Sequence, residues 1–334
     1  MKILFDLQGF PFFLAHGGVS IQVLQTKSAL QRCGVEVEFL RWWDESQKAD
    51  LIHCFGRAST GHINAAHARG IAYVMTDLLT AQGSRGTARV FAESLRNRLV
   101  SMAGGERLRR MLAWQPYRSA DAIVALTDWE AALMCKLYGA KRERVHVIPN
   151  GVERLFFEPG EPACRRGNEL LCVATITPRK RQIELAQAAV AAGVRLRFVG
   201  RPYSESDPYY QDFLRIVRAN SASLTYVGEV ESRSRLAELY RGACGFVLLS
   251  SMESQCLASL EAAACGCPLL LCDLPWARET FGPSASYAST HKTDRWAAML
   301  QAFARGNNPP PTRPLTWDDV AVTLIRLYAA ITDK

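Results

Sequence analysis

The sequence predicts an α/β protein made of two Rossmann-like, doubly wound domains. Short apolar runs alternate with amphipathic helical patterns along almost the whole chain, which is typical of parallel sheets covered by helices on both faces. The alternation stops in a loop rich in proline, glycine and charge at residues 158–167 and then starts again. A chain of 334 residues is long enough for two domains of ordinary size.

The first half of the chain predicts one complete doubly wound domain. Strands are predicted where apolar residues run together between turn residues, and helices where apolar residues recur every three or four positions. The predicted strands are residues 3–7, 35–40, 51–55, 72–75, 122–126 and 145–148. The predicted helices are residues 20–32 and 129–138, with a helix-rich basic segment at 85–118.

The second half of the chain repeats this arrangement. Its predicted strands are residues 169–174, 195–199, 224–227, 245–249 and 268–271, and its predicted helices are 182–192, 209–219, 234–242 and 259–265. A last amphipathic helix is predicted after the proline cluster, because Thr316 is a favourable N-cap and acidic residues follow it. We therefore place the domains at residues 1–155 and 156–314, followed by a terminal helix at 315–334.

Two parallel sheets in one chain predict a site in the cleft between the domains, because such sheets bind ligands at the carboxyl ends of their strands. The first candidate is Gly17 and Gly18, between the first strand and the first helix. Glycine lets the backbone approach a phosphate, and a helix N-terminus attracts anions. An ordinary turn is the simpler interpretation, and the incomplete GxGxxG pattern argues against NAD. Phe12 and Phe13 nearby are core residues or an apolar lip for an acceptor.

The second candidate is the basic turn after the first strand of the second domain. Arg179, Lys180 and Arg181 stand between that strand and a helix. Three cations at such a turn suit a diphosphate, because the helix N-terminus adds to their attraction. The alternative is a basic turn that only meets solvent.

The third candidate is a pair of glutamates that follows a buried strand. Glu261 lies on a helix made otherwise of small and apolar residues, where an unpaired carboxylate would be costly. Glu253 lies in the loop before that helix, so the two carboxylates can face one bound molecule. Recognition of its hydroxyl groups is one interpretation, and a capping or ion-pair role is the other.

Together these motifs resemble the family of retaining glycosyltransferases with the GT-B fold, of the group 1 type with a Glu-x7-Glu motif. The matching segments are residues 17–19, 120–127, 147–152, 178–180, 227–228 and 253–268. The resemblance covers nearly the whole chain. It implies an acceptor-binding first domain, a nucleotide-sugar-binding second domain facing it across a cleft, and a terminal helix that packs back toward the first domain.

The resemblance also implies roles for single residues. Gly17 and Gly18 would approach the donor phosphates, and Lys180 would hold the diphosphate. Glu261 would bind the ribose hydroxyls, and Glu253 would contact the transferred sugar. The other implied donor-side residues are Ser254, Gln255, Cys256 and Leu257, through backbone N–H groups, and Val230, beside the base.

The chain departs from the family pattern at several positions. Thr175 stands where an arginine is usual, so Arg179 or Arg181 would substitute for it. Thr76 and Asp77 stand where many members carry a histidine, which leaves Asp77 as a catalytic candidate. His53, taken as the end of a strand at residues 51–53, also resembles a family position and is, with Thr76, an acceptor-side candidate, although a histidine at a strand end is more often structural. Ser254 and Gln255 replace the usual glycine and aromatic residue, which suggests altered contacts to the donor sugar.

The implied reaction is sugar transfer with retention of configuration and without a metal or another cofactor. The leaving diphosphate would stay on the face of the acceptor and help to deprotonate its hydroxyl group, so the protein would mainly position and stabilise charge. The chain contains no Asp-x-Asp motif. Lys180 and backbone dipoles would then take the place of a metal at the diphosphate.

The formal net charge of +8 is concentrated between residues 85 and 118. Arginines there alternate with aliphatic residues, which fits a helix at an anionic membrane that presents a lipid-linked saccharide acceptor, or an ordinary helix with a solvated basic face. With no export signal and no apolar run long enough to span a bilayer, we expect a cytoplasmic protein, peripheral at most at the inner face of the membrane.

Three functions remain open on the sequence alone. The leading hypothesis is a glycosyltransferase that uses a UDP- or GDP-sugar in bacterial envelope polysaccharide or lipopolysaccharide synthesis. The second is a nucleotide-sugar epimerase of the same fold. The third is a non-catalytic protein that binds nucleotides or nucleic acid, although the basic segment lacks interleaved stacking aromatics and no nucleic-acid motif occurs. We therefore expect no nucleic-acid partner.

Overall fold

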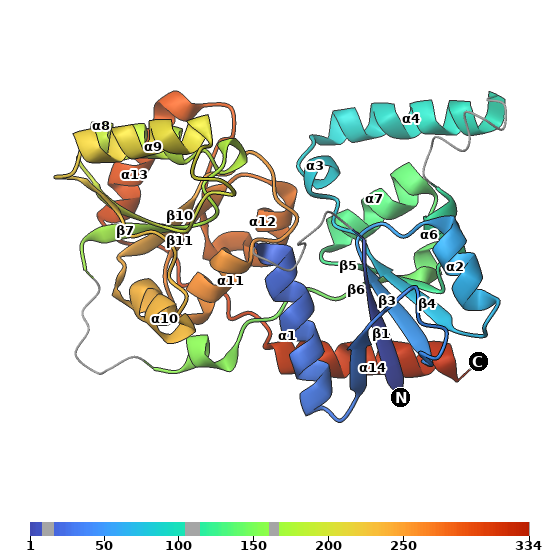
Figure 1. The fold of residues 1–334 in the computed structure, drawn as a ribbon. Coiled ribbons are helices and arrows are strands. Elements are labelled where there is room, and N and C mark those ends of the chain that lie inside the picture. Colours follow the sequence, from blue (N-terminus) through green and yellow to red (C-terminus); the bar gives the residue numbers. More distant parts are fainter. Residues whose placement is uncertain (9–16, 104–113, 160–166, 334) are drawn as a thin grey trace. The chain divides into compact units, whose positions relative to one another are not determined.

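The computed structural model describes residues 1–8, 17–103, 114–159 and 167–333. The chain divides into two compact units, which Figure 1 shows in blue to green with the red C-terminal helix, and in green through yellow to orange. The first unit consists of Met1–Gly151 and Leu315–Lys334, and the second of Val152–Pro314. The C-terminal helix therefore belongs to the first unit.

The first unit contains a six-stranded parallel sheet in the order β2-β1-β3-β4-β5-β6. The chain leaves β1 toward β2 and then returns to the other side of β1 for β3, so the order reverses at β1 and β3. Parallel pairing sets Ile3 opposite Leu51 in these two strands. The strands are β1 (Lys2–Leu7), β2 (Glu36–Phe39), β3 (Leu51–Phe55), β4 (Ala72–Thr76), β5 (Ala122–Ala125) and β6 (Val145–Val147).

Helices cover both faces of the first sheet (Figure 1). Side chains alternate along the strands, so that Ile52 and Cys54 face the core formed with α2, α6 and α7, whereas His53 faces α14. The helix α14 also packs against α1. The helices of this unit are α1 (Gly18–Arg32), α2 (Thr60–His67), α3 (Thr80–Gly83), α4 (Thr87–Ala103), α6 (Gln115–Ser119), α7 (Asp128–Tyr138) and α14 (Trp317–Thr332), with the 3-10 turn η1 (Arg142–Arg144).

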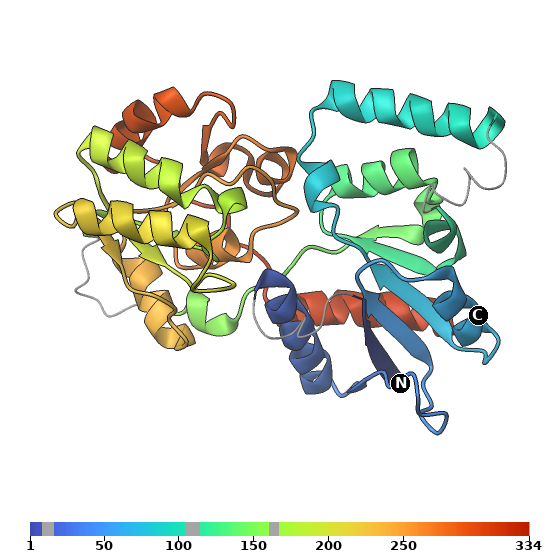
Figure 2. The same cartoon turned by 45° about the horizontal axis from the view of Figure 1, so that its top comes forward.

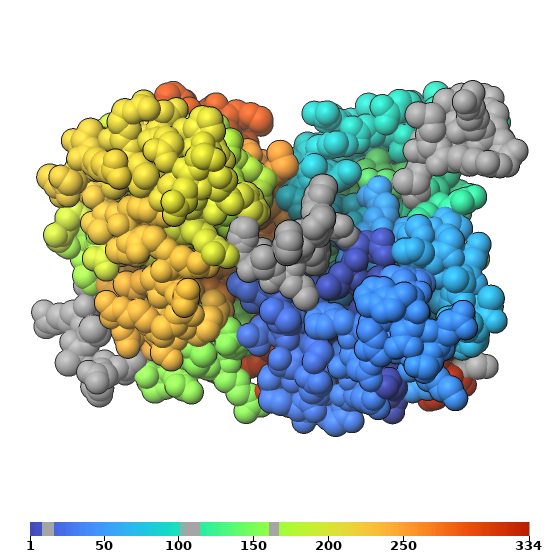
Figure 3. Space-filling model, viewed as in Figure 1, coloured from blue at the N-terminus to red at the C-terminus, as the bar shows by residue number. Residues whose placement is uncertain are grey.

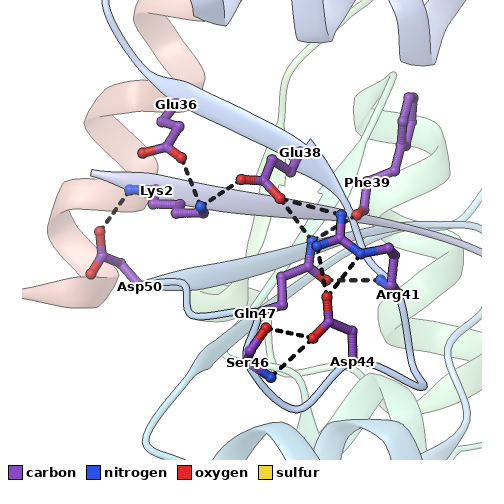
Figure 4. Close-up of polar contacts among 9 residues, drawn as sticks. All are labelled: Lys2, Glu36, Glu38, Phe39, Arg41, Asp44, Ser46, Gln47 and Asp50. Atoms are coloured by element: carbon purple, nitrogen blue, oxygen red, sulfur yellow. Dashed lines mark hydrogen bonds and ion pairs between the residues drawn. The ribbon is translucent and has the colours of Figure 1, made fainter.

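Charged side chains line the outer edge of the first sheet at β2 (Figure 4). The Lys2 ammonium lies 2.7 Å from Glu36 and 2.5 Å from Glu38, and Gln47 donates to Glu38 at 3.0 Å. The hydrogen bonds from Lys2 and Gln47 lower the pKa of Glu38 to about 2. Charges along an edge strand discourage pairing with another chain, so this edge is protected.

The second unit contains a six-stranded parallel sheet in the order β12-β11-β10-β7-β8-β9. The helices α8, α9 and α13 cover one face and α10 and α11 the other, as the turned view in Figure 2 also shows. The strands are β7 (Glu169–Val173), β8 (Arg195–Val199), β9 (Leu224–Tyr226), β10 (Gly245–Leu248), β11 (Leu269–Cys272) and β12 (Ser286–Ala288). The helices are α8 (Gln182–Ala192), α9 (Pro208–Ala219), α10 (Arg233–Gly242), α11 (Leu257–Ala264), α12 (Pro275–Phe281) and α13 (Trp296–Ala304), with the 3-10 turns η2 (Arg154–Phe157), η3 (Pro178–Lys180), η4 (Gly282–Ser284) and η5 (Thr293–Arg295).

The predicted α/β class with two Rossmann-like sheets is confirmed, and most element boundaries differ by one or two residues. The sequence prediction missed α2 and α3 in the first unit, and β12, α12 and α13 in the last third of the second unit. Strand β12 has only three residues, too short for a period-two pattern to show.

In the described ranges, no helix combines the length and apolar character needed to cross a bilayer.

Candidate functional site

The strand order of the second sheet reverses between β7 and β10, which are hydrogen-bonded neighbours. At such a reversal the helices that follow the two strands lie on opposite faces of the sheet. The loops at the carboxyl ends of the strands therefore part and leave room for a ligand. The loop after β7 carries the basic turn, and the loop after β10 carries Glu253.

Two contacts fix the loop after β7. Gly200, at the end of the neighbouring strand β8, has φ +136°, and a Cβ atom there would lie 2.0 Å from the carbonyl oxygen of Ala174. Only glycine allows this close approach. From the start of α8, the fully buried Gln182 side chain donates to the Thr175 carbonyl at 2.9 Å and accepts from the Thr177 N–H at 3.3 Å.

The basic turn and the first glutamate form one cluster. The Lys180 ammonium lies 2.5 Å from Glu253 Oε1, and the Arg179 guanidinium lies 3.0 Å from the same oxygen. The two loops are also joined through the backbone, since Arg179 donates to the Met252 carbonyl and the Ser251 N–H donates to the Arg179 carbonyl, both at 2.8 Å. Residues that are far apart in sequence thus meet at the reversal point.

The electrostatics of this cluster keep the Glu253 carboxyl ionised. Burial alone would raise its pKa, but the charges of Lys180 and Arg179 outweigh burial and hold the pKa below its ordinary value. Lys180 is itself buried, whereas the Arg179 side chain is 36% exposed. The result is a compact group of two cations and one anion at the open end of the sheet.

Glu261, in the second turn of α11, belongs to a second cluster. The Arg233 guanidinium donates to Oε1 of Glu261, and the Tyr240 hydroxyl donates to Oε2 at 3.0 Å. Arg233 also donates to Glu153 at 2.7 Å and lies over the Phe156 ring. The buried carboxylate therefore has the ion-pair partner that its helix made necessary.

Burial dominates the pKa values in this second cluster. It raises the pKa of the Glu261 carboxyl above its ordinary value, although the Arg233 charge and the Tyr240 hydroxyl oppose the rise. Burial and the neighbouring Glu261 charge raise the pKa of Tyr240 as well. Tyr240 therefore stays a hydrogen-bond donor to the carboxylate over the whole neutral range.

The other predicted donor-side residues lie around these two clusters. Ser254 and Val230 are half-buried, whereas Gln255, Cys256 and Leu257 are buried at the start of α11, where Cys256 is the N-cap. Arg181 turns away from Glu253, because it donates to the Thr290 carbonyl at 2.8 Å and lies over the Trp296 ring. Of the two arginines expected to stand in for the missing one near Thr175, the structure brings Arg179 to the cluster.

The first sheet has its own reversal point, between β1 and β3, and a pocket of about 350 Å³ lies there. Gly56, directly after β3, has φ +106°, and a Cβ atom there would lie 2.4 Å from the carbonyl oxygen of Gln8. This approach brings the two strand ends together. The pocket is lined by Gln8, Arg57, Ala58, Ser59, Thr60, Gln115 and Pro116.

Asp77 is connected to this pocket by a hydrogen bond from Arg57, which lines the pocket. Oδ2 of Asp77 accepts from Arg57 Nε at 2.8 Å and from the Tyr117 hydroxyl. Burial and then the Asp77 charge raise the pKa of Tyr117, so its hydroxyl keeps the donor role. Asp77 is thus a buried, charge-compensated carboxylate that fixes Arg57 at the wall of the pocket.

His53 and Thr76 lie inside the first unit rather than at a surface. His53 is in the middle of β3, which corrects its expected place at a strand end, because β3 continues to Phe55. Its Nε2 atom bonds the Thr76 hydroxyl at 2.7 Å and its Nδ1 atom bonds the Tyr328 hydroxyl of α14 at 2.6 Å. Burial lowers the pKa of His53 to about 3, so the ring is neutral and fastens α14 to the sheet.

Gly17 and Gly18 stand at the start of α1, which begins at Gly18, earlier than the predicted start at residue 20. Gly17 is the N-cap, with φ +106°, and the Ser20 hydroxyl donates to its carbonyl at 2.7 Å. Among the described residues, no atom lies within 4 Å of a Cβ added at Gly17, so this position is open to them. The acceptor-side candidates Phe12 and Phe13 lie outside the described residues.

Sequence reasoning missed four residues that the structure brings into these sites. Arg57 and Gln182 directly follow a strand end or open a helix, so the rule of the reversal point could have found them. Arg233 and Tyr240 face Glu261 from α10, and no local pattern signals a partner contributed by another helix. Within the described ranges, no group of three or more His, Cys, Asp or Glu side chains could hold a metal ion.

Two family profiles match this chain. The profile for "Glycosyltransferase Family 4" matches residues 37–154, and the profile for "Glycosyl transferases group 1" matches residues 158–305. A D-inositol 3-phosphate glycosyltransferase from Actinosynnema mirum is 25% identical over 391 positions, which cover 95% of this chain and 93% of that protein. The protein of the same name from Acidothermus cellulolyticus is 32% identical over 46% of this chain and only 38% of its own length.

Solved structures share the fold. HepE from Anabaena, in complex with UDP and glucose, superposes with a TM-score of 0.66 and 13% identity, over 98% of this chain and 99% of that one. Sucrose-phosphate synthase from Thermosynechococcus elongatus superposes with a TM-score of 0.67 and 17% identity, over 99% of both chains. With its two parallel six-stranded sheets, the chain thus has the two-domain, Rossmann-like GT-B fold.

Proposed function

The chain belongs to the glycosyltransferase group 1 family, and from this premise we propose that it transfers a sugar from a nucleotide-sugar to a hydroxyl acceptor with retention of configuration. The observation that carries the proposal is the convergence of Arg179, Lys180 and Glu253 at the reversal point of the second sheet. Family relatives named as glycosyltransferases, and the UDP held by HepE, support a UDP- or GDP-sugar as donor.

The donor diphosphate binds the cations that now hold Glu253. A diphosphate offers more negative charge to Lys180 and Arg179 than one carboxylate does, so it competes for their hydrogen bonds. Glu253 is then released to accept hydrogen bonds from hydroxyl groups of the transferred sugar. We assign Thr175, Ser254 and the backbone at the start of α11 to the same side of the donor.

Glu261 binds the ribose hydroxyl groups of the donor in this proposal. Its carboxylate is already aligned by Tyr240, and Arg233 shields it from the neighbouring Glu153. A ribose that donates two hydroxyl hydrogens can replace the guanidinium of Arg233 at this carboxylate. Val230, in the loop before α10, then stands on the side of the base.

In the transfer step, the bond between the sugar C1 atom and the diphosphate oxygen breaks, and a bond from C1 to the acceptor oxygen forms on the same face. The acceptor proton passes to the leaving diphosphate. Lys180 and Arg179 stabilise the charge that develops on that diphosphate, a task that a metal ion performs in other enzymes. We therefore propose that the reaction proceeds without added metal.

The pocket of the first unit is the proposed place for the acceptor. It is lined by hydroxyl, amide and guanidinium groups, which suit a saccharide, and Arg57 is held there by Asp77. A bacterial envelope saccharide or a lipid-linked saccharide is our first acceptor class. The relatives named for D-inositol 3-phosphate add a phosphorylated polyol to the acceptors that merit a trial.

A panel of UDP-, GDP-, ADP- and TDP-sugars with EDTA present tests the proposal by product analysis. We expect one donor to be consumed, with the sugar appearing on an acceptor or on water. Conversion of the donor into its epimer without transfer would identify an epimerase. Consumption of none of them, together with steeply salt-dependent binding to DNA or RNA, would favour the non-catalytic alternative.

A further inference from the structure

The helix α4 exposes a stripe of large apolar side chains. Phe91 is 72% exposed, Leu95 50%, Leu99 58% and Met102 79%. Among the described residues, each of α1, α8 and α14 carries one exposed large hydrophobic side chain, whereas α4 carries these four. An apolar stripe of this size on a soluble surface marks a contact with a partner or a membrane.

The inner side of α4, by contrast, is largely polar. Val90 is its buried apolar residue, and beside it Ser94 donates to the Lys136 carbonyl at 3.2 Å and Asn97 to the Leu137 carbonyl at 3.1 Å, both at the end of α7. Ordinary surface helices bury their apolar side and expose the polar one. The polarity of α4 is inverted relative to its own unit, so its outward side is built for a contact that the described part of the chain does not supply.

Arginines flank the stripe. At 100° per residue, the four apolar side chains fall within an arc of about 80°, with Arg98 at one border and Arg89 and Arg96 beyond the other. Glu93, the one acidic residue of α4, lies near the opposite side and pairs with Arg85 and Arg89. In Figures 1 and 2, α4 (cyan) runs along the outer side of α7, and in Figure 3 its atoms lie at the surface.

We propose that α4 lies in the interfacial layer of an anionic membrane, with Phe91, Leu95, Leu99 and Met102 inserted among the acyl chains and the arginines at the phosphate groups. An apolar stripe bordered by arginines matches the two layers of such a surface, because long basic side chains reach back to the head groups. The proposal rests on α4 alone, since the arginines at 107, 109 and 110 lie outside the described residues. It extends the proposed function by giving a lipid-linked acceptor a surface to come from.

Co-sedimentation of the full chain with vesicles tests this proposal. The probes are vesicles of phosphatidylcholine alone and of phosphatidylcholine with phosphatidylglycerol, at low and high salt and without donor or acceptor. We expect binding to the anionic vesicles that weakens with salt. F91Q combined with L99Q should lower the partition coefficient by about tenfold or more, and R89Q combined with R96Q by about tenfold on anionic vesicles only.

Trp43, which is 82% exposed in the loop after β2, provides the control, and W43Q should bind vesicles like the unchanged protein. All four apolar positions are exposed, so the variants should fold, which circular dichroism checks. Absence of binding to both vesicle types, or binding of both double variants that equals that of the unchanged protein, would overturn the proposal. A dimer that F91Q with L99Q turns into a monomer, without vesicle binding, would assign the stripe to a second copy of the chain. Because no donor is used, the result is independent of the transferase proposal.

Discussion

Each carboxylate that the sequence singles out is held by opposite charge in the folded chain. Glu253 is paired with Lys180 and Arg179, and Glu261 with Arg233. Removal of one partner from a buried pair leaves an uncompensated charge, so these groups are mutually dependent. In the proposed complex, a donor diphosphate gives Lys180 and Arg179 a new anionic partner, and hydroxyl groups of the sugar and the ribose donate hydrogen bonds to the two carboxylates.

At the same scale, His53 makes stability depend on pH. The pKa of His53 is about 3 in the folded chain, lower than the ordinary value near 6.5. Between these two pH values the unfolded chain binds a proton at this residue and the folded chain does not. Stability from this residue is complete above pH ~6.5 and falls as the pH drops, by about 1.4 kcal/mol per pH unit. His53→Gln should therefore lose about 2 kcal/mol less unfolding free energy between pH 7 and pH 5 than the unchanged protein does.

Urea unfolding followed by circular dichroism at the two pH values measures this difference. Glutamine keeps an amide that can bond Thr76 and Tyr328, so the variant should still fold. The exposed His291 gives the control, because His291→Gln should keep the slope of the unchanged protein. An unaltered slope in His53→Gln would show that His53 takes up its proton in the folded state.

At the scale of the element, α14 depends on its N-terminal cap. The Thr316 hydroxyl accepts from the Asp319 N–H at 3.2 Å, and the Asp319 carboxylate accepts from the Thr316 N–H at 2.9 Å, which is a capping box. Thr316→Ala should lower the unfolding free energy by about 1 kcal/mol. Thr323 on the same helix is exposed and its hydroxyl donates to the Asp319 carbonyl, so Thr323→Ala should change the unfolding free energy by less than about 0.5 kcal/mol. Equal effects in chemical denaturation would contradict the capping role.

The elements also show how far local patterns predict this structure. Local signals such as caps, glycines and apolar runs made some features predictable. These are the helix starts at Thr316 and after Arg181, and the ends of the strands before Lys180 and Glu253. The partners Arg233 and Tyr240 were not predictable, since their contacts with Glu261 join residues that are distant in sequence. For a related reason the sequence left open whether the apolar side of α4 faces outward: the spacing of residues shows that a helix has an apolar side but not which side the fold covers.

At the scale of the whole molecule, each of the two units has one reversal point at the open end of its sheet. In the second unit the reversal point gathers two cations and a carboxylate, and in the first it gathers the pocket around Arg57. The same architectural rule thus produces a cationic cluster in one unit and a hydroxyl-rich pocket in the other. The difference comes from the residues in the loops and not from the sheets.

The central claim is that a nucleotide-sugar donor binds at Lys180 and Glu261. Titration calorimetry of nucleotide-sugars in EDTA tests this claim most directly, because it measures donor binding itself. We predict that one nucleotide-sugar binds the unchanged protein, that Lys180→Ala and Glu261→Ala each weaken it by about tenfold or more, and that the exposed Arg235→Ala on α10 binds like the unchanged protein. Binding that survives both substitutions would place the donor elsewhere. Absence of binding by every nucleotide-sugar would contradict the account itself.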